Sequence, residues 1–371
     1  MHVWIPALSV IGLFFVGWHV GIFVHEMGHV CAALLCGWKT LQVKVGSGRA
    51  WLTFTIGDWQ FQWAPYPRSG LARVFAQNVA YFRLKSVIIF LSGPAFTACL
   101  LVLLWEMLIG STLLPSAPAW LRICLFLLLL VQGGMLFWCL VPGMVQVDGR
   151  MLPNDMLQVW SSITMKKDDV GSHFAGNVAA EALIYLQRGQ NDRAHSIMER
   201  NALADVGIPP LSAKILWIVV LQAEGRTDEV DRVKKSLLDA ASVEDGSRVT
   251  VLDGLACLPL YYGLGASLDE ALGYIEQALH EAPDKITLKG TKAALLIELG
   301  RIEEGLKLIE EVAANSASEN DRAIVLYYKA LAASELGNRA DGRSQLQQVI
   351  EKYPECVVRP HVERRFWNDP E

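Results

Sequence analysis

The chain has 371 residues, 52% of them hydrophobic and 19% charged, and a formal net charge of -5. This length suits two or more domains, and the acidic balance gives no reason to expect a nucleic-acid partner. The seven cysteines are scattered, odd in number and without a C-x-x-C pair, which argues against a disulfide framework. The long apolar runs lie in the first part of the chain, and the remainder is charged and rich in Ala, Leu and Glu. We therefore predict a membrane core over residues 1–160 and a helical domain over residues 161–371.

Three apolar stretches, at about residues 3–36, 86–110 and 119–141, each reach the ~20 residues that cross a bilayer. The first is too long for a signal peptide and lacks a basic start, so we expect it to be retained. The connection between the first two stretches carries seven Lys and Arg residues against the single acid Asp58. The positive-inside rule places this connection and the tail after the third stretch in the cytoplasm. These patterns favour a multi-pass protein of a bacterial plasma membrane.

Residues 41–63, within the first connection, alternate between apolar and polar side chains in the manner of strands. Turn residues at 46–48 and 57–58 divide them, which predicts a small antiparallel sheet or β-hairpin element. An edge strand of that sheet could pair with an extended substrate segment, although an ordinary linker hairpin explains the pattern equally well.

The first apolar stretch contains a histidine, a glutamate and a second histidine in the order H-E-x-x-H: His25, Glu26 and His29. On a helix, the two histidines stand four residues apart on one face and can hold the same zinc ion. Glu26 then lies beside the metal, where it can take a proton from a zinc-bound water for peptide hydrolysis. Ionisable groups at membrane depth are costly, which favours a functional role over a chance match. His19 faces elsewhere on the helix, and we expect it to be a packed histidine.

A catalytic zinc site normally has three protein ligands, so one more is needed. Asp148 follows the third apolar stretch, which by the charge rule returns to the cytoplasmic side. We predict Asp148 as the third ligand, with Asp155 as the alternative. An Asp-Gly pair such as Asp148-Gly149 is also a very common turn, so this prediction depends on the topology.

These motifs resemble the site-2 protease family of intramembrane zinc metalloproteases. The first helix of that family carries H-E-x-x-H, as at residues 25–29; the second carries a Gly-Pro motif, as at Gly93-Pro94; and the third is followed by Asp-Gly, as at Asp148-Gly149. The resemblance covers residues 1–160 and implies that Asp148 supplies the remaining zinc ligand. Family members commonly have asparagine where Thr97 and Cys139 stand, which puts substrate handling in question. Only residues 111–118 separate the second and third stretches, so no inserted PDZ-like domain is expected.

From about residue 172 the sequence repeats with a period near 36 residues, and each repeat is marked by a turn glycine between two apolar helical runs. This resembles the tetratricopeptide repeat, a pair of antiparallel helices that stacks into a solenoid. Small side chains follow most of these glycines by five residues, and Pro283 and Pro354 end two of the repeats. A generic helical bundle is the alternative. The turn glycines are Gly189, Gly225, Gly265, Gly300 and Gly337.

The fold class expected is mainly α: a polytopic core of about three transmembrane helices with a small β-hairpin element, followed by an α-solenoid. The function expected is a zinc-dependent intramembrane endopeptidase that cleaves a transmembrane or membrane-border peptide bond, with Glu26 as general base. Its partners are a membrane-protein substrate, the lipid bilayer and a protein or peptide on the repeats; the substrate-binding residues are unknown. One alternative is a catalytically silent, membrane-anchored scaffold that acts through its repeats. A metal transporter is a weaker alternative, because three spans without internal repeats make a poor conduit.

Overall fold

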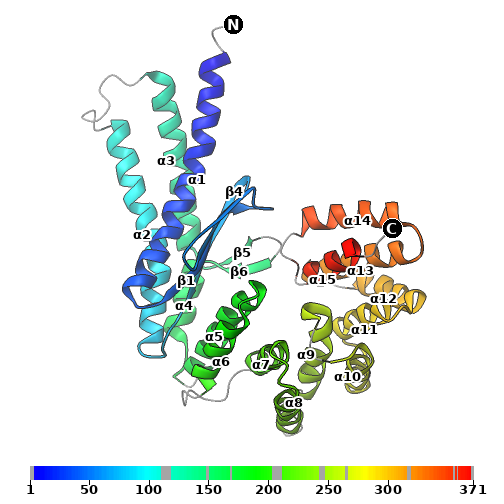
Figure 1. Ribbon diagram of the computed structural model, residues 1–371. Coiled ribbons are helices and arrows are strands. Elements are labelled where there is room, and N and C mark those ends of the chain that lie inside the picture. The colour runs from blue at the N-terminus through cyan, green and yellow to red at the C-terminus, as the bar shows by residue number, and fades with distance from the viewer. Residues whose placement is uncertain are drawn as a thin grey trace. The chain divides into compact units, whose positions relative to one another are not determined.

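The computed structural model in Figure 1 describes residues 4–109, 118–147, 150–167, 169–202, 211–241, 247–263, 266–315, 319–353, 356 and 358–368. The chain divides into two compact units. The first comprises residues 1–147 and 151–174, and the second comprises residues 148–150 and 175–371. The predicted residues Asp148, Gly149, Gly265 and Pro354, and the connection over 111–117, lie outside the described residues.

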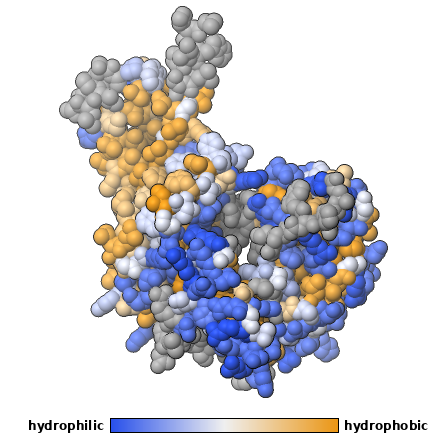
Figure 2. Space-filling model, in the orientation of Figure 1, coloured by the Kyte–Doolittle hydropathy of each residue, from blue (hydrophilic) through white to orange (hydrophobic). Residues whose placement is uncertain are grey.

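Among the described residues of the first unit, three helices are long and apolar enough to cross a membrane: α1 (Trp4–Leu35), α2 (Phe82–Ile109) and α3 (Ala119–Leu140). Each packs against the other two, and α2 begins four residues before the predicted span. Large apolar side chains point outward from them, including Ile11 at 65% and Phe137 at 67% exposure. Figure 2 shows the resulting apolar surface over these helices. In water this surface would be unfavourable, but it suits contact with lipid.

A four-stranded sheet follows α1. Its strands are β1 (Lys39–Ser47), β2 (Leu52–Ile56), β3 (Trp59–Trp63) and β4 (Tyr66–Phe75), in the spatial order β2-β3-β1-β4. The expected hairpin is β2–β3, but β1 pairs with β3 in parallel, so the prediction of a purely antiparallel sheet was wrong. Strand β4, which forms one edge of the sheet, was not predicted from the sequence. Its position at this edge is what brings β4 against α1.

The first unit ends in a short hairpin and a helix. Strands β5 (Met144–Val147) and β6 (Arg150–Pro153) pair with one another, and α4 (Asp155–Thr164) then packs on α2. Arg83, near the start of α2, donates hydrogen bonds to the carbonyl oxygens of Ser162 and Ile163 at the end of α4. A guanidinium group is well suited to cap the free carbonyl groups of a helix end. These contacts fix α4 beside the membrane helices.

The second unit is a series of helical hairpins in which each helix packs mainly on its neighbours in the chain. Glycines 189, 225, 300 and 337 end the first helix of a hairpin with φ between 70° and 88°, a conformation that glycine adopts without strain. Gly305 and Gly342 lie where a Cβ atom would meet the preceding helix at 2.6 and 2.9 Å. The prediction of tetratricopeptide-like repeats is confirmed. The helices are α5 (Asp169–Gln187), α6 (Asn191–Ala202), α7 (Leu211–Ala223), α8 (Thr227–Ala241), α9 (Ser247–Tyr262), α10 (Leu268–Glu281), α11 (Ile286–Glu298), α12 (Ile302–Asn315), α13 (Glu319–Glu335), α14 (Arg339–Lys352) and α15 (Arg359–Asn368).

Candidate metal centre

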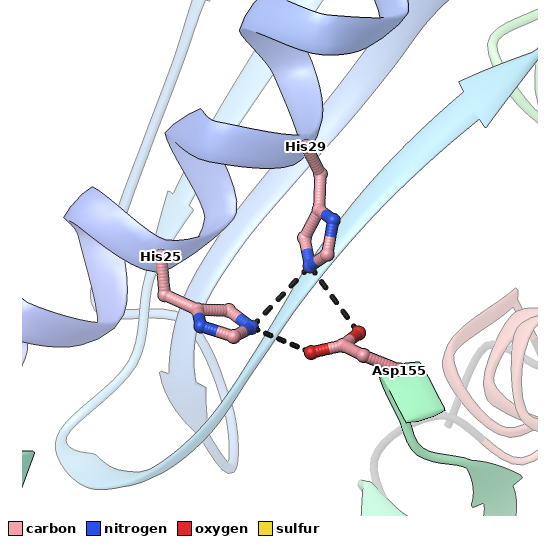
Figure 3. Close-up of side chains that lie close together, drawn as sticks. All are labelled: His25, His29 and Asp155. Atoms are coloured by element: carbon pink, nitrogen blue, oxygen red, sulfur yellow. Dashed lines mark hydrogen bonds and ion pairs between the residues drawn. The ribbon is translucent and has the colours of Figure 1, made fainter. Parts of the chain in front are cut away.

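The two histidines of the H-E-x-x-H motif lie one turn apart on α1 and point the same way. Their Nε2 atoms are 3.3 Å apart, and each residue is 6% exposed. Figure 3 shows both imidazole rings directed toward Asp155 at the start of α4. The Nε2 atom of His25 is 2.9 Å from Asp155 Oδ2, and that of His29 is 3.3 Å from Oδ1. Two nitrogen atoms and a carboxylate therefore converge on one point.

Hydrogen bonds on the far side of each ring fix its orientation. His29 Nδ1 donates to the carbonyl oxygen of Ile89 at 2.7 Å, since a carbonyl can only accept. The Thr97 hydroxyl donates its proton to the carbonyl oxygen of Gly93 at 3.1 Å, so it accepts from His25 Nδ1 at 2.9 Å. With both Nδ1 atoms carrying the proton, each Nε2 is the atom that can bind a metal.

The third group of the site comes from a helix start. Asn154 caps α4: its Oδ1 accepts from the backbone N–H of Leu157 at 3.0 Å, and its Nδ2 donates to the carbonyl oxygens of Trp138 and Val141 at the end of α3. Asp155 is the first residue of α4, where a carboxylate also interacts well with the helix dipole. Asn154 thereby ties the position of Asp155 to the third membrane helix. Asp155 was the alternative ligand in the sequence analysis, and Asp148 lies outside the described residues.

The distances suit a tetrahedral zinc ion. Two ligand atoms held about 2.0–2.1 Å from such an ion lie about 3.3 Å apart, which matches the spacing of the two Nε2 atoms. Two imidazoles and one carboxylate are also a donor set that zinc accepts in catalytic sites. The Asp155 carboxylate lies within 2.9 and 3.3 Å of the two Nε2 atoms, where a cation shared by the three groups would stabilise its negative charge.

Glu26 lies next to this cluster and lines the same cavity, of about 530 Å³. Two glycines make room for the polar groups. A Cβ atom on Gly70 of β4 would lie 2.3 Å from Glu26 Oε1, and one on Gly93 of α2 would lie 2.3 Å from His29 Nε2 and 2.8 Å from His25 Nε2. The backbone amide of Ala72, also in β4, interacts with the Glu26 carboxylate. Strand β4 thus borders the candidate general base on one side.

The other residues named from the sequence fall into two groups. Thr97 and Cys139, which stand where the family commonly has asparagine, both lie at the centre: Thr97 holds His25, and Cys139 lines the cavity. His19 lies elsewhere, with its ring nitrogens 3.0 Å from the carbonyl oxygens of Phe15 and Ala64. Asn154 was not predicted as part of the site. Its position directly before an amphipathic helix is typical of an N-cap and could have favoured Asp155 over Asp148.

The family profile described as Peptidase family M50 matches residues 13–340, which is most of the chain. The chain belongs to this peptidase family, and the resemblance to site-2 proteases drawn from its three motifs is confirmed. A search of curated proteins gives no significant match. Membership supports the metalloprotease class and a membrane protein, and the family is zinc-dependent in general.

Several solved structures resemble the chain through helical repeats. A tetratricopeptide repeat protein from Parabacteroides merdae is 12% identical, with a TM-score of 0.41, and the match covers 79% of this chain and 100% of that one. A thermophilic repeat protein from Thermus thermophilus is 15% identical, with a TM-score of 0.37 and coverage of 52% and 96%. A putative kinesin light chain from Podospora anserina is 18% identical, with a TM-score of 0.34 and coverage of 54% and 99%. At these TM-scores, the likenesses say nothing about what the repeats bind.

Proposed function

We propose that this protein is a zinc-dependent intramembrane endopeptidase in which His25, His29 and Asp155 hold the metal and Glu26 is the general base. The observation that carries the proposal is the convergence of the two Nε2 atoms and the Asp155 carboxylate beside Glu26, in a cavity among helices long enough to span a membrane. Asp155 takes the place that the sequence analysis gave to Asp148. Family membership supports the same class of enzyme.

Zinc bound by these residues supplies a Lewis acid that polarises the scissile carbonyl and lowers the pKa of water. Glu26 accepts a proton from the attacking water as the new C–O bond forms. It then donates that proton to the leaving amine as the peptide C–N bond breaks, so the products are a carboxylic acid and an amine. His25 and His29 keep their Nδ1 protons throughout, because Thr97 and the Ile89 carbonyl hold them.

The substrate is a membrane-spanning or membrane-border segment that lies extended beside β4. An α-helical peptide bond is shielded by its own hydrogen bonds, so a protease of this kind needs the segment unwound. Strand β4 is at one edge of its sheet, and its residues 68–72 line the cavity that contains Glu26. Pairing with this strand would present a peptide carbonyl to the metal centre. This moves the expected edge strand from residues 41–63 to residues 66–75.

The membrane is proposed to be a bacterial plasma membrane. Basic residues dominate the connection that follows α1, which supports an orientation with the repeats in the cytoplasm. The repeats have no chemistry of their own in this proposal. Their role is to bind a protein or peptide, either the substrate itself or a partner that regulates cleavage. The metal-transporter alternative gains no support from the geometry, since the polar groups converge on one point.

The test compares peptide cleavage by purified wild type, Glu26→Gln and Glu106→Gln in detergent, with a bacterial membrane extract as substrate and mass spectrometry of new peptide ends. Glu106 is an exposed acid of the same membrane core and serves as the matched control. Loss of the general base should reduce cleavage within membrane segments by about 10²- to 10⁴-fold, whereas Glu106→Gln should cleave like wild type. Equal cleavage by Glu26→Gln would contradict the proposal. It would favour the scaffold alternative, in which the repeats do the work.

A further inference from the structure

The last helix, α15, lies across one face of the repeat array. The first helices of successive hairpins contact each other in turn, α9 with α11 and α11 with α13, so they form one continuous face. Helix α15 packs on α9 and on α13, and its side chains reach Glu298 at the end of α11. Figure 1 shows α15 in red next to α13. The face that α15 covers spans three hairpins, and such a face is what a solenoid offers to a partner.

Apolar side chains dock α15 at a four-residue spacing. Val358, directly before α15, and Val362 are fully buried, and Phe366 is 8% exposed. All three belong to the same hydrophobic core as Leu260 of α9 and Tyr328 of α13. A helix of ten residues is only marginally stable alone in water. The repeat array therefore keeps α15 helical. It binds α15 in the way that a hydrophobic groove binds the apolar face of an amphipathic helix.

A buried acid on the array meets two basic side chains of α15. The Glu298 side chain is 3% exposed; His361 Nε2 lies 3.1 Å from its Oε1, and Arg365 Nη1 contacts its Oε2. Arg365 Nη2 also lies 3.2 Å from Glu335 of α13. Burial alone would raise the pKa of Glu298, but hydrogen bonds and charges from His361 and Arg365 lower it. Any occupant of this face must supply a cation here, since an unpaired buried carboxylate is costly.

The connection to α15 is short, since only residues 354–357 separate Tyr353 from Val358. A tether of this length gives α15 a high effective concentration at the face, so a free peptide competes with it poorly. Arg365 and His361 are nevertheless 33% and 19% exposed, so the ion cluster opens to solvent at its rim. These two side chains are therefore in contact with solvent while α15 is docked, whereas the Glu298 carboxylate between them is buried.

We propose that α15 is an intrachain ligand that occupies the partner-binding face of the repeats, and that the partner is a basic amphipathic helix of another protein. The partner helix is expected to share the sequence pattern of the α15 segment, with apolar residues at positions i, i+4 and i+8 and an arginine at i+7. Basic segments at the cytoplasmic border of membrane proteins have this chemistry. The inference rests on the role in partner binding that the proposed function gives to the repeats. It adds that α15 must leave before that partner binds.

The test measures binding of a fluorescein-labelled peptide with the sequence of residues 356–371 to the full-length protein in detergent. The chain variant Arg365→Glu brings a third carboxylate to Glu298 and Glu335 and should release α15. The control is Arg339→Glu, the same charge change at an exposed position of α14. We expect the peptide to bind Arg365→Glu at least about 10-fold more tightly than it binds wild type or Arg339→Glu. A peptide that itself carries Arg365→Glu should bind at least about 10-fold more weakly.

Equal peptide binding to Arg365→Glu and to wild type, with the array still folded by circular dichroism, would overturn the inference. If Arg365→Glu does not fold, a protease site inserted between Tyr353 and Val358 replaces it. After cleavage, an excess of unlabelled peptide should displace the α15 fragment, and a fragment that stays bound at saturation would overturn the inference. Peptide binding to the repeats does not depend on the metal centre, so adding His25→Ala to Arg365→Glu should leave it unchanged. Zinc content and peptide cleavage therefore test the metal centre independently of this inference.

Discussion

Two buried clusters in this protein use the same kinds of side chain with different results. In the first unit, His25, His29 and Asp155 direct their donor atoms to one point beside a cavity. In the second unit, the Glu298 carboxylate is taken up by His361 and Arg365, and apolar side chains pack around them. Histidine and carboxylate together are therefore no sufficient sign of a metal site.

The difference lies in what surrounds each cluster. Gly93 and Gly70 stand where any larger residue would fill the space at the metal centre, and the far nitrogen of each imidazole is held by Thr97 or by a backbone carbonyl. The Nε2 atoms of His25 and His29 thus face the cavity. Around Glu298, by contrast, the polar atoms satisfy one another across helices. In a site that can bind a metal, hydrogen bonds hold the far side of each ligand side chain and free space lies beside its donor atom. In a cluster that only stabilises the fold, the polar atoms pair with one another.

The largest effect on zinc binding should come from filling the space at the metal centre. Gly93→Ala adds a Cβ atom 2.3 Å from His29 Nε2 and 2.8 Å from His25 Nε2, so one of the rings must move. We expect zinc affinity to fall by at least about 100-fold, measured by chelator competition. Gly133→Ala is the matched control, because nothing lies within 4 Å of its Cβ position on α3. Equal zinc affinity in the two variants would show that the space beside the histidines is not needed.

A smaller effect should follow from removing the support behind one ring. Thr97→Val keeps the shape of the side chain but loses the hydroxyl that accepts from His25 Nδ1. We expect zinc to bind about 10-fold more weakly, with Thr97→Ser close to wild type because it restores the hydroxyl. A loss of the same size in Thr97→Ser would assign the effect to packing. Competition with a chelator at one fixed pH measures the zinc affinity of both variants.

A change in the cluster around Glu298 should affect the stability of the repeat array and leave zinc binding unchanged. Glu298→Gln removes the acceptor of Arg365 and His361 and should destabilise the repeat array by about 1–3 kcal/mol at neutral pH. The pKa of Glu298 is lower in the folded state than its ordinary value of 4.5, so its contribution is complete above that pH and is lost as the pH falls through the folded pKa. The difference between wild type and Glu298→Gln should therefore shrink below about pH 4.5. Amide hydrogen exchange of α11 and α15 measures this difference in stability. The control is Glu310→Gln, at an exposed position of α12.

The local features of this fold follow from the sequence. The three long apolar helices follow from apolar length, and they begin and end within about four residues of the predicted stretches. The turn glycines at 189, 225, 300 and 337 mark the hairpins because a helix often ends in a left-handed residue, which glycine provides. The pair His25 and His29 is fixed by helical periodicity alone. Each of these features depends on residues close together in the chain.

The features that escaped prediction depend on residues far apart. Strand β4 has Pro67, Arg68 and Gly70 within it, which hide the alternation of a strand, and its place beside Glu26 depends on pairing with β1. The parallel pairing of β1 with β3 likewise has no local sign. The choice between Asp148 and Asp155 depends on how the chain turns after α3, and Asn154 sets that turn through hydrogen bonds to residues 11 to 16 positions earlier.

The most direct measurement is the zinc content of detergent-purified protein for wild type, His25→Ala, Asp155→Ala and Asp148→Ala. The proposed centre predicts about one zinc per chain in wild type and in Asp148→Ala, and a loss in His25→Ala and Asp155→Ala. Zinc that is lost in Asp148→Ala but kept in Asp155→Ala would return the third ligand to Asp148. A wild type without zinc, purified without chelators, would contradict the metal centre itself.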